Sequence, residues 1–123
     1  MELSEIIEIV IKLVVGLSIL NVWLINRDKN SQWRGGNATN MEEEFKAYGL
    51  SKNMMIIVGT LKCLFAVLLL LSLYLFKLEL YAALGIAVLM AGAILMHLKI
   101  NDPLKKSLPA AIFLVLSLIV IWI

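Results

Sequence analysis

Cysteine, histidine and proline are scarce in this chain of 123 residues: Cys63 and His97 are single occurrences, and there are two prolines. A single cysteine excludes an intrachain disulfide and a Cys-x-x-Cys redox pair, which argues against a membrane thiol–disulfide oxidoreductase. A single histidine gives poor ligand spacing for zinc, so we expect no metal site. Phosphate-binding glycine loops, haem motifs and nucleic-acid motifs are absent too, so we expect no nucleic-acid partner.

Charged residues are also few, at 16%, whereas hydrophobic residues make up 62% of the chain. This balance excludes an ordinary soluble domain. Four apolar runs each have about the 20 residues that a helix needs to cross a bilayer. We predict an all-α polytopic membrane protein, a single four-transmembrane-helix bundle over residues 1–123. The expected spans are about 5–26, 53–76, 79–98 and 104–123. The first run has acidic flanks and no small-residue cleavage site, so we expect it to remain as a helix.

The connection between the first two spans predicts a short amphipathic helix at about 40–48. Thr39 or Asn40 is placed to cap this helix, and three glutamates in its first turn suit the helix dipole. Its apolar side chains share one face at helical spacing. They are Met41, Phe45 and Tyr48. We therefore expect the short helix to cover the mouth of the bundle with its apolar face inward.

Lysine and arginine gather on one side of the predicted topology. They are Arg27, Lys29, Arg34, Lys46, Lys52, Lys99, Lys105 and Lys106. The positive-inside bias places loops 27–52 and 99–106 in the cytoplasm and both termini outside. We expect a multi-pass protein of the cell membrane, with the lipid bilayer as its first partner.

Lys62 lies in the middle of the second apolar run. A charge at that depth costs about 2.5–3.5 kcal/mol on insertion scales unless it finds a partner or water. The remaining polar residues of the chain converge on the same half of the bundle. The candidate ligand-binding residues are Asn21, Arg34, Glu43, Glu44, Tyr48, Lys62, His97 and Asp102.

Two interpretations of this polar group remain open. In the first it is a structural network, in which Lys62 pairs with a glutamate or with Asp102 and His97 bonds a backbone carbonyl. In the second it is a pocket for a polar head group, such as a quinone ring or a lipid-like substrate, entered from the bilayer. Asp102 is also placed to cap the fourth span, with Pro103 at its first helical position.

Three segments resemble the DoxX-like family of small four-helix membrane proteins. They are Trp33-Arg34-Gly35-Gly36-x-Ala38-x-Asn40-x-x-Glu43-Glu44-Phe45-x-x-Tyr48-Gly49, then Gly59-Thr60-Leu61-Lys62, then His97-x-Lys99-x-x-Asp102-Pro103. The resemblance spans nearly the whole chain. It implies a four-helix fold and a shared polar site around Lys62 and His97, without implying one reaction. The family takes its name from a subunit of a thiosulfate–quinone oxidoreductase, and other relatives are implicated in oxidative-stress complexes or in membrane-protein assembly.

These observations lead to a first functional hypothesis and two alternatives. The first is a membrane subunit or binding protein with a polar pocket for a quinone-like or other lipid-soluble ligand, in a redox complex. Lys62 would orient the polar head, and His97 would exchange protons or hydrogen-bond with it. The alternatives are a non-enzymatic scaffold or assembly factor, and a small oligomeric transporter. A quinone is the candidate cofactor, and a redox enzyme or another membrane protein is the candidate partner; whether the chain is itself an enzyme is left open.

Overall fold

The structure, a computed structural model, describes residues 2–123. These residues form helices and turns, with no strand among them. The helices are α1 (Leu3–Leu20), α2 (Met41–Ala47), α3 (Lys52–Leu71), α4 (Glu79–Lys99) and α5 (Leu108–Trp122). A π-helical turn, Asn21–Ile25, continues α1, and 3₁₀ turns Phe76–Leu78 and Leu104–Ser107 precede α4 and α5.

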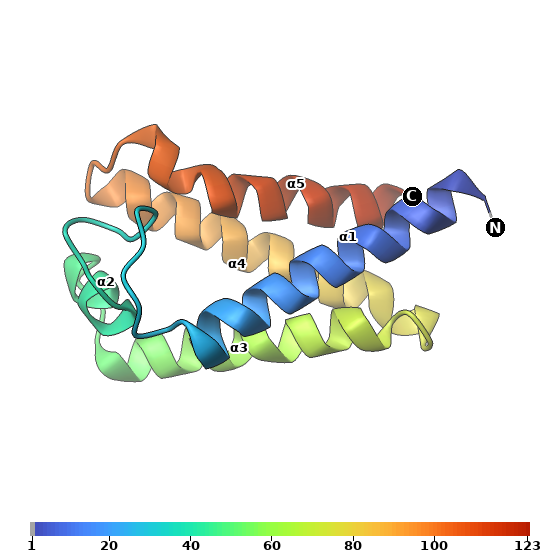
Figure 1. Cartoon of the computed structure of the whole chain (residues 1–123), viewed down its shortest axis with the longest axis horizontal. Helices are drawn as coiled ribbons and strands as arrows, with labels where there is room; N and C mark the ends of the chain where they lie inside the picture. The colour runs from blue at the N-terminus through green and yellow to red at the C-terminus, as the bar shows by residue number, and fades with distance from the viewer. Residues whose placement is uncertain (1) are drawn as a thin grey trace.

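The four long helices form a bundle in which α1 packs on α3 and α5, and α4 packs on α3 and α5. Both chain ends lie at one end of the bundle, and α2 with its flanking loop lies at the other (Figure 1). The centre is filled by small and branched side chains with almost no exposed surface. Examples are Val15, Ala66, Ala82, Ala83 and Ile86. Small residues of this kind let membrane helices approach closely.

The outer surface of the bundle is apolar. Within residues 2–123, four helical segments are long and apolar enough to cross a membrane: Leu3–Ile25, Lys52–Leu71, Phe76–Lys99 and Leu104–Trp122. Large hydrophobic side chains such as Leu17, Ile57 and Val88 are exposed along them. An apolar surface of this kind is suited to contact with lipid. The helical backbone can also lie in lipid, because each helix satisfies its own backbone hydrogen bonds. The chain is therefore a multi-pass, four-helix membrane protein.

The short helix α2 begins and ends at the residues that its sequence indicates. The side chain of Asn40 accepts a hydrogen bond from the Glu43 amide and so caps the helix. Gly49 follows its last turn with φ +81°, a conformation that glycine adopts without steric cost. Phe45 and Tyr48 are buried. The apolar face of α2 therefore packs against the bundle as expected.

Two turns differ from the sequence expectation. Asp102 does not cap the last span: a 3₁₀ turn with Pro103 at its N-cap position comes first, and the Asp102 carboxylate bonds elsewhere. The apolar run of the second span continues to Phe76, but α3 ends at Leu71. Ser72 caps the end of α3, and its hydroxyl donates to the Leu69 carbonyl. The apolar residues after Ser72 belong to the turn that leads back into α4.

Candidate functional site: a polar cavity beneath helix α2

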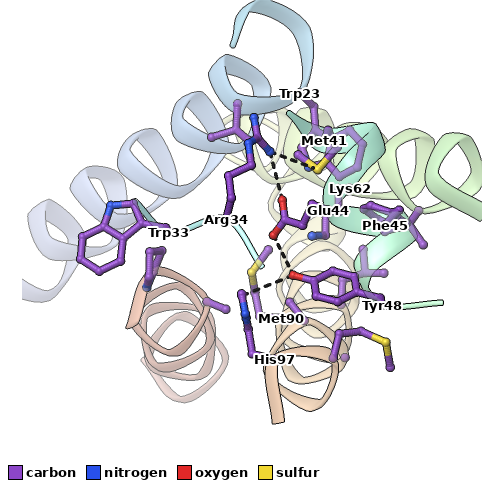
Figure 2. A pocket seen from close by; sticks show the side chains of 18 of the residues that line it. Trp23, Trp33, Arg34, Met41, Glu44, Phe45, Tyr48, Lys62, Met90 and His97 are labelled. Atoms are coloured by element: carbon purple, nitrogen blue, oxygen red, sulfur yellow. Dashed lines mark hydrogen bonds and ion pairs between the residues drawn. The ribbon is translucent and has the colours of Figure 1, made fainter. Parts of the chain in front are cut away.

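A buried ion pair joins the loop after α1 to helix α2. Arg34 Nη1 lies 3.0 Å from Glu44 Oε2, and both side chains are almost fully buried. The same guanidinium donates to the backbone carbonyls of Lys29 at 2.8 Å and Arg27 at 2.9 Å. Arg34 therefore folds the loop around itself while it neutralises the carboxylate of α2 (Figure 2).

A chain of polar contacts runs from Glu44 across the cavity to α4. The Tyr48 hydroxyl donates to Glu44 Oε1 at 2.7 Å, and the backbone N–H of Gly35 donates to the same oxygen at 3.1 Å. The Tyr48 hydroxyl also lies 3.5 Å from His97 Nε2 (Figure 2). Burial raises the pKa of Tyr48 far above its usual value, and the negative charge of Glu44 adds to that shift. Tyr48 therefore stays a neutral donor at physiological pH.

The other nitrogen of His97 is held by Asp102. His97 Nδ1 lies 2.7 Å from Asp102 Oδ2. The carboxylate also accepts from the Gly36 backbone N–H at 3.0 Å, and Lys106 Nζ lies 3.9 Å away. When Nδ1 carries the proton that Asp102 accepts, Nε2 is the acceptor of the neutral ring. Asp102 thereby directs the free lone pair of His97 toward Tyr48 and the cavity.

Lys62 makes no salt bridge with the described part of the chain. Within residues 2–123, no carboxylate oxygen lies within 4.0 Å of its ammonium nitrogen. Of the two open interpretations, the structural network therefore lacks its pairing of Lys62 with a glutamate or Asp102, because Glu44 pairs with Arg34 and Asp102 with His97.

Lys62 instead contacts the indole ring of Trp23. Lys62 Nζ lies 5.4 Å from the centroid of that ring, a cation–π distance. Trp23 in turn rests on Gly59 of α3, where an added Cβ would lie 2.5 Å from the ring. The absence of a side chain at Gly59 is what lets the indole come close enough to α3 to contact Lys62.

These polar groups stand at one end of a cavity of about 750 Å³ inside the bundle. Arg34, Glu44, Tyr48, Lys62 and His97 line it, and the rest of its wall is mostly apolar. Figure 2 shows their polar ends converging beneath α2. A cavity of several hundred cubic ångströms with apolar walls and a few convergent polar groups is typical of small-molecule sites.

A family model for the DoxX-like family matches residues 35–120, more than half of the chain. The chain belongs to the DoxX-like family. The matched range contains α2, α3, α4 and nearly all of α5 and so most of the cavity wall. Beyond the family, no curated protein and no solved structure matches this DoxX-like chain.

Three of the candidate residues of this DoxX-like protein lie outside the cavity wall. Asn21 accepts a hydrogen bond from the Asn26 side chain at 2.9 Å and is exposed. Glu43 is exposed and accepts from the Thr39 backbone N–H at 2.8 Å and from the Thr39 hydroxyl. These bonds hold the pKa of Glu43 below its usual value. Asp102 lies behind His97 and acts on the cavity through it.

Sequence reasoning missed two features of the DoxX-like protein. The first is the contact of Lys62 with the ring of Trp23, which belongs to a different membrane span and which no residue spacing indicated. The second lies at the other end of the bundle, where Lys12 pairs with Glu79 of α4 at 2.9 Å in addition to its neighbour Glu8, one turn earlier in α1, at 3.4 Å. The expected antiparallel order of the spans puts Lys12 and Glu79 at the same end of the bundle, and that placement was the available signal for the pair.

Proposed function

We propose that this DoxX-like protein binds a lipid-soluble molecule, of the quinone-like kind, in the cavity beneath α2. The observation that carries the proposal is Lys62, a cation in an apolar span that lines the cavity without a carboxylate within 4.0 Å among residues 2–123. A charge that only stabilised the fold would have a counterion, because an unpaired ion at that depth is costly. A bound ligand with polar oxygens supplies the missing partner.

The polar end of the cavity offers complementary contacts to such a head group. Lys62 donates and is positively charged, whereas neutral His97 accepts at Nε2. Asp102 fixes the ring of His97 at 2.7 Å, so that acceptor is held in place before a ligand arrives. A ring with a carbonyl oxygen on one side and a hydroxyl on the other would contact both groups.

A redox role would need a second protein. The chain has one cysteine, so its own side chains cannot cycle between a dithiol and a disulfide. In the proposed function the chain is a subunit or small binding protein that holds the ligand for a partner enzyme of a redox complex. The lysines and arginines that surround α2 favour a cytoplasmic position for this end of the bundle.

Gly92 offers a direct test, because it lines the cavity and an added Cβ there meets nothing within 4 Å. Gly92→Leu should fill the cavity without a clash against protein. Leu84→Phe is the matched control, since it enlarges an exposed side chain of the same helix away from the cavity. Mass spectrometry of the purified proteins measures co-extracted lipid-soluble molecules, and decylubiquinone serves as an added probe.

We expect Gly92→Leu to lower ligand content and probe affinity by about tenfold, because the leucine side chain takes space that the ligand would fill. Leu84→Phe should match the original chain. Equal ligand content in both variants and the original chain would overturn the proposal. That result would instead favour the scaffold or assembly function, in which the cavity has no occupant.

A further inference from the structure

The charges at the polar end of the cavity do not balance, and their imbalance points to the class of ligand. We propose that the cavity selects an amphiphile with an anionic oxygen head group, a carboxylate or a phosphate, and that Lys62 is its counterion. The inference rests on the proposed function, because it specifies the ligand of the same cavity.

Among the described residues, four cations line the cavity, and Lys29 is the exposed one, so solvent can screen its charge. The other three, Arg34, Lys62 and Lys106, are buried or half-buried, and two carboxylates pair with two of them. Arg34 lies 3.0 Å from Glu44. Lys106 lies 3.9 Å from Asp102, which also takes the Nδ1 side of His97. The three shielded cations and the two carboxylates leave one positive charge. In the part of the chain that the structure describes, that charge belongs to Lys62.

The hydrogen-bond donors around the cavity also single out Lys62. Arg34 directs its N–H groups to Glu44 and to backbone carbonyls of its own loop. The Tyr48 hydroxyl gives its proton to Glu44. Lys62 has three N–H donors and makes no hydrogen bond with residues 2–123. The face of Trp23 offsets part of its charge from one side and offers no oxygen to accept these donors.

Oxygen anions satisfy both needs at once. A carboxylate or phosphate accepts the free N–H groups of Lys62 and neutralises its charge, whereas a neutral carbonyl or hydroxyl provides only the hydrogen bond. A group that supplies the missing counterion of a charge in an apolar span should bind more tightly than its uncharged analogue. The apolar wall then takes the hydrocarbon body, through side chains such as Val22, Leu89 and Phe113.

Binding of two matched ligand pairs to the full-length protein in detergent micelles tests this inference. Oleate is compared with methyl oleate, and oleoyl lysophosphatidate with monoolein, so that each pair differs mainly in head-group charge. Isothermal calorimetry measures each affinity for the original chain, Lys62→Met and Lys62→Arg. Lys52→Met is the control for general charge, because Lys52 begins α3 and lies outside the cavity.

We expect the charged member of at least one pair to bind about ten- to hundredfold more tightly than its neutral partner, the range for a hydrogen bond to a charged group. Oleate and lysophosphatidate together identify which of the two anions is preferred. Lys62→Met should abolish the preference, whereas Lys62→Arg and Lys52→Met should keep it.

The outcomes separate this inference from the proposed function. If neutral and charged members bind equally and Gly92→Leu weakens both, the cavity binds ligands but the anion preference is overturned. A preference that survives in Lys62→Met overturns the role of Lys62. If no member of either pair binds and decylubiquinone also fails, the proposed function itself is overturned.

Discussion

Two lysines lie within apolar helices of this protein, and their surroundings differ. Lys12 of α1 is 2% exposed, with Glu79 at 2.9 Å, Glu8 at 3.4 Å and the Ser72 carbonyl at 3.4 Å. Lys62 of α3 is half-buried, with an aromatic ring and a cavity beside it and no carboxylate within 4.0 Å among residues 2–123. Lys12 thus has two carboxylates beside its single positive charge. Lys62 has none at contact distance.

This difference separates a structural charge from a charge that a ligand can use. Lys12 connects α1 to the beginning of α4, so its ion pairs hold together segments that are far apart in the sequence. Lys62 makes no ion pair with any of the residues that the structure describes. Because a charge in an apolar span is costly without a partner, this contrast is the basis of our proposal that the cavity holds a ligand.

Removing each lysine gives the sharpest and largest contrast. Lys12→Met should lower the free energy of unfolding by about 3–5 kcal/mol, because two carboxylates are left without their counterion. Lys62→Met should leave the ligand-free protein unchanged or more stable, because no carboxylate loses a partner. Denaturant unfolding in micelles, followed by Trp fluorescence, measures both.

A triple variant controls for the cause of the Lys12 effect. Adding Glu8→Gln and Glu79→Gln to Lys12→Met should recover most of the lost stability, because no uncompensated charge remains. If Lys62→Met destabilises the ligand-free protein as much as Lys12→Met, the contrast fails and Lys62 is a structural residue.

Alkaline pH should loosen the cavity end with a smaller effect. The folded-state pKa of Tyr48 is raised, so the protonated phenol is favoured by folding, and stability is lost as the pH rises above the unfolded value of 10.0. The slope should reach at most about 1.4 kcal/mol per pH unit. Stability curves between neutral and alkaline pH measure it, and Tyr48→Phe should flatten them. An equal slope in Tyr48→Phe would assign the loss to other groups.

Acid should have the smallest effect on stability, and the loss should begin at α2, the helix that contains Glu43. The pKa of Glu43 is lowered by its bonds to Thr39, so this contribution is present above the usual value of 4.5 and is lost as the pH falls below it. The side chain is exposed, which limits the effect. Hydrogen exchange of the α2 amides should speed up in acid, after correction for intrinsic rates. In Glu43→Gln the corrected rates should no longer depend on pH; a dependence like that of the original chain would contradict the assignment.

Local patterns predicted the helices well, and side-chain pairing poorly. The cap of α2 at Asn40 and its buried face follow from residues that are neighbours in the sequence. The partner of Glu44 could not be read from the sequence, because two cations, Arg34 and Lys62, are within reach and only the path of the loop selects Arg34. Arg34 also binds three carbonyls of that loop, a contribution that no residue pattern reveals.

The sequence by itself determined that the chain is a four-helix membrane protein with a charge in an apolar span and an amphipathic helix beside it. Length and hydropathy are properties of single segments, so they survive whatever the segments pack against. The tertiary structure decided which charges meet. It pairs Arg34 with Glu44 and Lys12 with Glu79, and it places Lys62 in the wall of a cavity. Those assignments depend on ångström distances between distant segments, and electrostatic pairing falls off over just such distances.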